Sequence, residues 1–408
     1  MQRVVFVNRY FYPDYSATSQ LLSDLARGLA AAGRRVHVVT SRQRYDDPRA
    51  MLAPNEVVDG VEVHRVWTSR FGRGSLPGRA LDYLTFYLST GWRLARLLQP
   101  ADVIVAKTDP PMLSVLTAPI SRLRGACLVN WLHDVFPELA IALDVRGLRG
   151  ALGRVLERLR DWSLREAACN VVLGNRMAEY LESRGVAHER VRVIENWADG
   201  ESVRPVPAQE STLRREWGVE GNFIVGYSGN MGRVHEFGTI LDAAERLRDD
   251  AGTVFLFIGG GNRREWIEED AKRRGLSSFV FKPYQQRERL RDSLSAPDVH
   301  LVSLRPELEG LVVPSKFYGV AAAGRPTIFI GAPDGEIAQI LRQHDCGCVV
   351  RQGDGAGLAT CIRALRDDPN LRRRLGENAR RVVEQRFDKH IALESWCRLL
   401  DELACGGA

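Results

Sequence analysis

The sequence lacks any apolar run long enough to cross a membrane. A spanning helix needs about 20 consecutive apolar residues, and no stretch of the 408 residues comes near that length. Met1, Gln2 and Arg3 lead straight into a strand-like apolar run, which leaves no room for the apolar core of a signal peptide. We therefore expect a cytoplasmic protein, and the length suggests two or three domains.

Several chemical signatures are missing as well. The seven cysteines are scattered, and none has the spacing of a zinc knuckle or a redox pair. Reduced, mostly buried thiols are therefore expected. The chain has neither the glycine fingerprint of a dinucleotide site nor the serine elbow of a hydrolase. Histidines and carboxylates show no ligand spacing along the sequence, so no metal site is predicted.

The charge balance, by contrast, is clearly basic. The formal net charge is +6 and the sequence pI is about 9.0. Such a balance favours anionic partners, namely nucleotide phosphates, acidic lipid surfaces or nucleic acid. The hydrophobic fraction of 45% is ordinary for a globular protein, and each half of the chain can bury a sizeable core.

Strand-like and helical runs alternate in two series, over residues 4–173 and 223–366. This alternation predicts an α/β architecture with parallel sheets. We expect two facing, doubly wound Rossmann-like domains, residues 1–198 and 199–385, with a linker rich in turn formers around their junction. A last helix, residues 386–408, is expected to pack back on the first domain. Ligands bind at the carboxyl ends of such strands, so the predicted active site is the cleft between the sheets.

The segment after the strand-like run of residues 299–304 is the most informative. Acidic Glu309 is followed by a turn with Gly310 and then by a small-residue helix. Free amides at a helix start attract anions, Ser315 is the predicted N-cap, and Lys316 adds a cation. A carboxylate facing a phosphate cradle suits a nucleotide-sugar. An ordinary strand–turn–helix unit would give the same pattern.

Other strand ends carry similar loops. Gly229 and Gly232 follow the strand-like run of residues 223–228 and permit close approach of a ligand. Arg233 can bind phosphate oxygens bidentately. The small, hydroxylated loop after the first strand puts Thr18 in reach of a phosphate. In each case the alternative is a solvated loop without a ligand.

His133 and Asp134 end the strand-like run of residues 127–132. A polar pair at the carboxyl end of a strand is well placed to contact a substrate. The alternative is a helix N-cap, Asp134, beside a structural histidine.

On these residues the chain resembles glycosyltransferase family 4. The tandem α/β halves, the Glu309 segment, the Arg233 loop and the strand end at His133 and Asp134 carry the resemblance, which extends over nearly the whole chain. It implies the GT-B fold, with an acceptor-binding first domain and a donor-binding second domain. It also implies a retaining, metal-independent transfer from a nucleotide-sugar.

Residues 12–19, 196–199 and 313–316 narrow the resemblance to a bacterial branch that builds surface polysaccharide. That branch includes N-acetyl-L-fucosaminyl transferases of O-antigen assembly. It implies a UDP-sugar donor with an N-acetylated hexosamine or deoxyhexosamine. The implied acceptor is a saccharide linked to polyprenyl diphosphate, as in lipopolysaccharide synthesis.

The resemblance also assigns roles to residues. Arg233, Lys316 and the amides of residues 310–316 would stabilise the leaving diphosphate. Glu309 would orient the sugar hydroxyls, and His133, beside Asp134, would touch the donor near the anomeric carbon. The leaving phosphate would help deprotonate the acceptor, so neither a protein nucleophile nor a cofactor is expected. The remaining donor-binding residues are expected to be Ser16, Ala17, Thr18, Gly229, Asn230, Gly232, Gly260, Lys282, Pro283, Tyr284, Gly310, Leu311, Val312 and Ser315.

The chain departs from the family pattern in two places. The family's second glutamate, which holds the ribose, would fall at Gly319. The usual arginine and lysine of the phosphate loop are displaced, because Arg233 comes two residues late and Glu236 takes roughly the lysine position. We expect Lys316 to replace that lysine.

Two stretches indicate a membrane-facing surface. Residues 79–98 and 146–165 mix arginines with aromatic and aliphatic side chains at helical spacing. Basic amphipathic helices lie on anionic bilayers, which would hold the enzyme on the inner face of the cell membrane. The alternative is two core stripes with solvated arginine faces.

Two other function classes stay open. A UDP-sugar 2-epimerase of the same fold would need no acceptor and no membrane-facing surface. A non-catalytic nucleic-acid-binding protein would use the basic charge, but no zinc motif or aromatic RNA-binding signature supports it, and no nucleic acid partner is expected.

Overall fold

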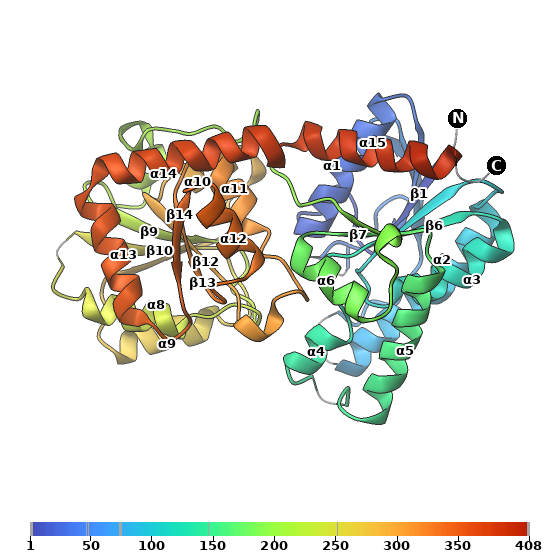
Figure 1. Cartoon of the computed structure of the whole chain (residues 1–408), viewed down its shortest axis with the longest axis horizontal. Helices are drawn as coiled ribbons and strands as arrows, with labels where there is room; N and C mark the ends of the chain where they lie inside the picture. The colour runs from blue at the N-terminus through green and yellow to red at the C-terminus, as the bar shows by residue number, and fades with distance from the viewer. Residues whose placement is uncertain are drawn as a thin grey trace. The chain divides into compact units, whose positions relative to one another are not determined.

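The computed structural model describes residues 3–45, 47, 49–72, 76–145, 147–250 and 252–405. The chain divides into two compact units, and Figure 1 colours the chain by residue number from the N-terminus to the C-terminus. Unit 1 contains residues 1–195 and 390–408, and unit 2 contains residues 196–389. The chain therefore passes from one unit to the other twice. Met1, Gln2 and Arg146, which figured in the sequence predictions, lie outside the described residues.

Unit 1 is built on a sheet of eight strands in the order β3-β4-β2-β1-β5-β6-β7-β8. All neighbouring pairs are parallel except β3 and β4, which form an antiparallel edge that the sequence did not predict. The central strands are apolar on both sides because helices cover both faces (Figure 1). The strands are β1 (Arg3–Val7), β2 (Arg35–Ser41), β3 (Asn55–Val58), β4 (Val61–Val66), β5 (Val103–Lys107), β6 (Cys127–Trp131), β7 (Cys169–Val172) and β8 (Val191–Val193).

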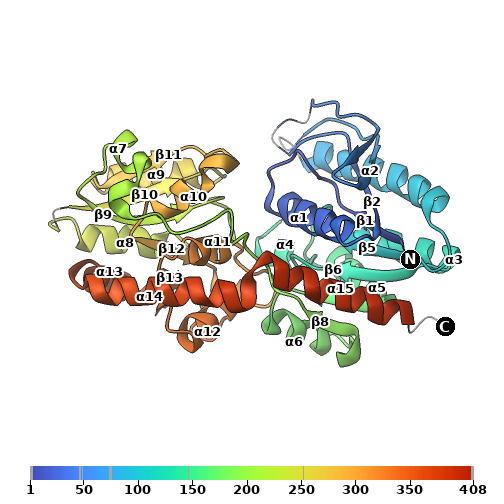
Figure 2. The same ribbon diagram turned by 90° about the horizontal axis from the view of Figure 1, so that it is seen from above.

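Helices α2 and α3 cover one face of this sheet, where Phe86 and Leu94 of α2 pack on Val7 and Ile104. The last helix, α15, packs on α1 and on the end of β6 (Figures 1 and 2). The helices of unit 1 are α1 (Ala17–Ala31), α2 (Leu76–Leu97), α3 (Leu113–Arg124), α4 (Glu138–Ala142), α5 (Ala151–Glu166), α6 (Asn175–Ser183), η1 (His188–Arg190) and α15 (Lys389–Cys405).

Unit 2 has a fully parallel six-stranded sheet in the order β11-β10-β9-β12-β13-β14. Its main core lies between one face of the sheet and helices α8 and α13, where Tyr227 and Phe257 stack at 5.4 Å. The strands are β9 (Phe223–Ser228), β10 (Thr253–Ile258), β11 (Phe279–Lys282), β12 (Val299–Ser303), β13 (Thr327–Ile330) and β14 (Gly347–Val350). The helices are η2 (Ala208–Glu210), α7 (Thr212–Glu216), α8 (Gly238–Arg246), α9 (Arg264–Arg273), η3 (Arg287–Arg289), α10 (Leu290–Ser295), η4 (Pro306–Leu308), α11 (Lys316–Ala322), α12 (Glu336–Gln343), α13 (Gly355–Asp367), α14 (Pro369–Val382) and η5 (Val383–Phe387).

Both units thus have the doubly wound topology that the alternating pattern predicted. The strand order runs outward in both directions from β9 and β12 in unit 2, and from β1 and β5 in unit 1. Loops at such a reversal of strand order diverge above the sheet and leave room for a ligand. Among the described helices, none combines the length and the apolar content that crossing a bilayer requires.

Candidate active site

In unit 2, the two loops at the reversal of strand order carry most of the predicted donor-binding residues. The loop after β9 begins with Gly229 and reaches His235, and the loop after β12 ends at Lys316. Gly229 has a φ of 125°, a backbone conformation that suits glycine. A Cβ at Gly229 would lie only 2.9 Å from the Lys316 Cε. The lysine side chain therefore passes closely over this loop.

The Lys316 ammonium is held by a histidine. Its Nζ lies 2.6 Å from His235 Nε2 and 5.0 Å from the centroid of the Tyr227 ring. Partial burial lowers the pKa of Lys316 to about 7. Among the described residues, no carboxylate lies within ion-pair distance of Lys316.

His235 is fixed from its other side by strand β12. Its Nδ1 lies 2.6 Å from the Ser303 carbonyl oxygen, and the Ser303 hydroxyl accepts the backbone N–H of Glu236 at 3.2 Å. Burial, and then the neighbouring Lys316, lowers the pKa of His235 well below its usual value. The ring is therefore neutral at physiological pH.

The positions that depart from the family pattern have structural explanations. Glu236, in place of a lysine, accepts the backbone N–H of Thr239 in the first turn of α8 at 3.1 Å. Gly319 lies on α11, where an added Cβ would be 3.2 Å from Leu294 Cδ1. A glutamate at that position would press against Leu294 of α10.

Glu309 and Ser315 lie in the loop between β12 and α11. Glu309 accepts the backbone N–H of Glu336 at 3.3 Å, so its carboxylate lies at the start of α12. Ser315 occupies the N-cap position of α11, but its side chain makes no capping hydrogen bond. The predicted serine cap is therefore wrong. The Ser315 side chain is exposed.

The remaining predicted residues of unit 2 lie at the carboxyl edge of the same sheet. Tyr284, after β11, reaches Gly260, after β10, with its ring 3.4 Å from the position of an added Cβ. Gly260 in turn accepts the backbone N–H of Met231 at 2.7 Å. The structure thus brings the loops after β9, β10 and β11 together. At this edge lie Gly229, Asn230, Gly232, Arg233, Gly260, Lys282, Pro283, Tyr284, Gly310, Leu311, Val312, Ser315 and Lys316.

Unit 1 contains a second lysine–histidine pair. Lys107, the last residue of β5, places its Nζ 2.9 Å from Nε2 of His133, which follows β6. The same Nζ lies 3.4 Å from the centroid of the Trp131 ring. Burial lowers the pKa of both Lys107 and His133. Since Lys107 engages Nε2, the other ring nitrogen of His133 is the one available to a ligand.

Asp134 is a partly protonated carboxyl near neutral pH. Burial raises its pKa to about 6, although a hydrogen bond from Thr108 opposes the shift. Its Oδ1 has no hydrogen-bond partner among the described residues. The other predicted residues of unit 1, Ser16, Ala17 and Thr18, begin α1 at the carboxyl end of β1, with Ser16 at the N-cap position.

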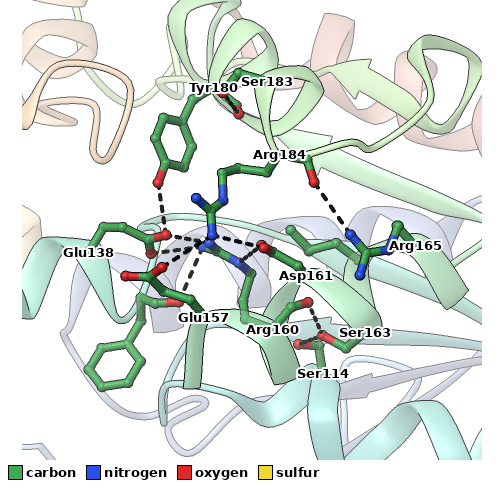
Figure 3. Close-up of polar contacts among 12 residues, drawn as sticks. Ser114, Glu138, Glu157, Arg160, Asp161, Ser163, Arg165, Tyr180, Ser183 and Arg184 are labelled. Atoms are coloured by element: carbon green, nitrogen blue, oxygen red, sulfur yellow. Dashed lines mark hydrogen bonds and ion pairs between the residues drawn. The ribbon is translucent and has the colours of Figure 1, made fainter. Parts of the chain in front are cut away.

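An ion-pair network fixes the chain just after His133 and Asp134 (Figure 3). The buried Arg160 of α5 donates to the Phe136 carbonyl at 3.3 Å and pairs bidentately with Glu138 of α4. Arg160 also donates to Asp161 at 2.8 Å. Tyr180 of α6 donates to Glu138 at 2.8 Å, so three helices converge on one carboxylate.

The two predicted membrane-facing stretches form helices with exposed apolar stripes. On α2, Phe86 is buried, whereas Leu81, Leu84, Leu88 and Trp92 are 46–67% exposed. On α5, Leu152, Val155, Leu159 and Trp162 are 36–53% exposed. Helix α3 packs against both α2 and α5. The core-stripe alternative therefore holds for the inner face of α2, where Phe86 and Leu94 are buried, and fails for the exposed apolar residues of both helices.

One histidine–carboxylate cluster forms that the sequence spacing did not reveal. His37 of β2 lies 3.2 Å from His64 and 3.3 Å from Glu62, both of β4. The cluster lies near the amino-terminal ends of these strands, at the opposite sheet edge from His133. The Arg93 guanidinium is 2.7 Å from His64 Nδ1. A cation-binding role is therefore opposed by a fixed positive charge.

The sequence did not point to three residues of these clusters. His235 lies in the loop after β9, but only its neighbours Gly229, Asn230, Gly232 and Arg233 were predicted as site residues. Lys107 is the last residue of β5, the neighbour of β6. This position at the carboxyl end of a strand could have identified it as a candidate site residue. Arg160 carried no signal, because its partner Glu138 lies 22 positions away.

Comparisons with known proteins agree with this geometry. Residues 18–197 match the model of the "Glycosyl transferase 4-like domain", and residues 209–382 match "Glycosyl transferases group 1". The chain is 28% identical over 330 residues, 78% of each chain, to the "Probable glycosyltransferase WbjE" of Pseudomonas aeruginosa. It is 25% identical over 377 residues, 86% of each chain, to the "Putative colanic acid biosynthesis glycosyl transferase WcaI" of Escherichia coli K12.

Solved structures share the fold. Anabaena Alr3699/HepE, solved in complex with UDP-glucose, superposes with a TM-score of 0.72 over 98% of this chain and 100% of its own, at 17% identity. The two Rossmann-like α/β units are thus the GT-B architecture that the sequence predicted.

Proposed function

Because the chain is a glycosyltransferase that joins a glycosyl transferase 4-like domain to a group 1 domain, we propose that it builds cell-surface polysaccharide. Its proposed donor is a UDP-sugar that carries an N-acetylated hexosamine or deoxyhexosamine. Its proposed acceptor is a saccharide linked to polyprenyl diphosphate. Transfer proceeds with retention of configuration and without a metal ion.

One observation carries the donor part of this proposal. Lys316 reaches over Gly229 at the point where the strand order of unit 2 reverses. A lysine whose charge no described carboxylate neutralises, next to a glycine loop, suits a diphosphate. The relatives support the polysaccharide and UDP parts of the proposal, since WcaI is described as a colanic acid biosynthesis enzyme and HepE was solved with UDP-glucose.

The proposed mechanism follows from where charge develops. As the diphosphate leaves, negative charge grows on its oxygens while the sugar becomes oxocarbenium-like. Lys316 and Arg233 stabilise the oxygens because preorganised cations act where charge appears in the transition state. The leaving phosphate takes the proton of the acceptor hydroxyl, so no protein nucleophile is required.

His133 and Asp134 of unit 1, and Glu309 of unit 2, have proposed roles on the sugar side. His133, with Nε2 engaged by Lys107, offers its other ring nitrogen to the donor sugar. Glu309 accepts hydrogen bonds from sugar hydroxyls through the carboxylate that the start of α12 holds. Asp134 lies directly beside His133, and its raised pKa keeps part of its population neutral near pH 6.

The proposed cellular location is the inner face of the membrane, where a lipid-linked acceptor is found. The exposed apolar stripes of α2 and α5 support this location, and arginines such as Arg79, Arg96 and Arg158 flank them. Exposed apolar surface of this extent marks an interaction site. Basic residues add attraction to anionic lipid.

The test is transfer by the purified enzyme. UDP-, GDP- and ADP-linked N-acetylated sugars are offered with a polyprenyl-diphosphate-linked saccharide, in EDTA and in Mg²⁺. The proposal expects a UDP-sugar to be consumed equally in both, with retained anomeric configuration by NMR. Dependence on Mg²⁺ or an inverted product would contradict the mechanism. Conversion of the UDP-sugar without any acceptor would favour a 2-epimerase instead.

A further inference from the structure

Lys316 is held by a neutral ring, and the hydrogen bonds determine which ring atom carries the hydrogen. The Ser303 carbonyl oxygen can only accept, so His235 Nδ1, at 2.6 Å, must donate. In a neutral imidazole the second nitrogen then carries a lone pair. His235 Nε2 therefore accepts from the Lys316 ammonium at 2.6 Å. The β12 backbone thus sets the tautomer that receives the lysine.

This arrangement differs from a salt bridge in one important respect. A carboxylate partner would neutralise the lysine and weaken its attraction for an anion. A neutral imidazole takes one of the three ammonium hydrogens and leaves the net charge unchanged. The remaining hydrogens stay available to a ligand above Gly229. The lysine is held in place by a partner that brings no negative charge to offset the ammonium.

We propose that His235 is the positioning residue of the donor site, which holds the charged Lys316 against the donor diphosphate through the tautomer set by Ser303. This inference rests on the proposed function, because it assumes that Lys316 binds the diphosphate. His235 acts through Lys316 and contacts no substrate itself. This role also explains why position 236 can be a glutamate. The loop after β9 does not supply the family's lysine there, but it supplies His235, which holds Lys316 from the loop after β12.

The central test is UDP binding by calorimetry at pH 7 with the full-length protein. His235→Phe keeps a ring in contact with Tyr227 and Phe237, which lie 6.0 and 6.3 Å from His235, but removes both hydrogen bonds. We expect its UDP affinity to fall by about tenfold or more. His235→Gln restores an acceptor near the position of Nε2, so it is expected to recover much of the lost affinity.

A double-mutant cycle separates positioning from general stability. If His235 acts through Lys316, then His235→Phe has no further effect on UDP affinity in a Lys316→Met background. His300→Phe is the control, because His300 of β12 is also a histidine with a backbone carbonyl partner, its Nε2 lies 2.9 Å from the Leu294 carbonyl oxygen, and it is fully buried. Its UDP affinity is expected to equal that of the wild type.

The outcomes distinguish the two proposals. If the wild-type enzyme fails to bind UDP, the proposed function is contradicted. If the wild type binds UDP and His235→Phe binds it equally well, the positioning role is overturned while the function stands. If His235→Phe lowers UDP affinity by the same factor in the wild-type and Lys316→Met backgrounds, the positioning role is overturned too. The donor KM in the transfer assay should rise in His235→Phe by the same factor as the UDP dissociation constant.

Discussion

At the scale of single residues, Lys316 combines the charge proposed to bind the donor with a cost in stability. Its pKa falls from 10.5 to about 7 in the folded protein because the side chain is partly removed from water. The unfolded chain therefore binds the lysine proton more tightly between those two pH values. The free energy of unfolding must then rise with pH across this window. The destabilisation is largest below about pH 7 and disappears above about pH 10.5.

Replacing Lys316 by methionine should therefore stabilise the protein while it weakens UDP binding. We expect the free energy of unfolding of Lys316→Met to exceed that of the wild type by about 1–2 kcal/mol at pH 7, because Lys316 is only half-buried and solvent screens part of the effect. The gain should shrink at pH 10. Urea unfolding at both pH values measures it. A variant that is less stable than the wild type at pH 7 would refute the argument.

The loop sequences made Arg233, Lys316 and the glycines candidates for phosphate binding, because that role needs particular residue types next to a strand end, and the role itself stays a prediction. The pairs that hold these residues were not predictable. His235 and Lys316 are 81 positions apart, and Lys107 and His133 are 26 apart. Such pairs form only because neighbouring parallel strands end at one sheet edge. Their identity depends on register, which the sequence pattern does not fix.

At the scale of elements, the Arg160–Glu138 ion pair ties α4 to α5, and the hydrogen bond from Tyr180 to Glu138 adds α6 (Figure 3). Arg160→Met would leave the Glu138 carboxylate half-buried without its cation. Loss of one partner of a buried pair costs about 3–5 kcal/mol, and we expect urea unfolding to show a loss of this size. Arg184→Met, in which a more exposed arginine is lost, should cost about 1 kcal/mol or less. Equal losses would contradict the special role of Arg160.

The outward face of α2 offers a test of the membrane surface. A triple variant, Leu84→Gln, Leu88→Gln and Trp92→Gln, should keep its stability, because exposed substitutions usually change it by less than about 0.5 kcal/mol each. Binding to vesicles with anionic lipid should fall several-fold, as measured by co-sedimentation at low salt. Trp266→Gln, on α9 of unit 2 and 41% exposed, is the control. Vesicle binding that survives in the triple variant would argue against this surface.

Elements with a strong apolar periodicity were predictable from the sequence, and the elements without it were missed. The strand-like run of residues 299–304, for example, corresponds to β12 (Val299–Ser303). The edge strands β3 and β8 were missed because they are short and partly exposed. Helix α14 was missed because arginines fill its outer face and hide a modest buried stripe.

At the scale of the whole molecule, the chain returns to unit 1 after it has completed unit 2. Helix α15 supplies Trp396, which is fully buried and packs at 4.9 Å against Trp131 of β6. Arg34 of unit 1 also pairs with Asp401 at 2.6 Å. The last segment of the sequence is therefore part of the unit that begins the chain.

Trp396→Ala should consequently weaken unit 1 and spare unit 2. Removal of a buried tryptophan costs about 3–5 kcal/mol through lost burial and the cavity that remains. The cavity would open against Trp131, whose ring lies under the Lys107 ammonium. Hydrogen-exchange mass spectrometry should therefore show faster exchange in β5 and β6, with β9 and β12 unchanged. Faster exchange in both units would mean that they unfold together, and unchanged exchange in β6 would mean that Trp396 does not support the His133 strand end.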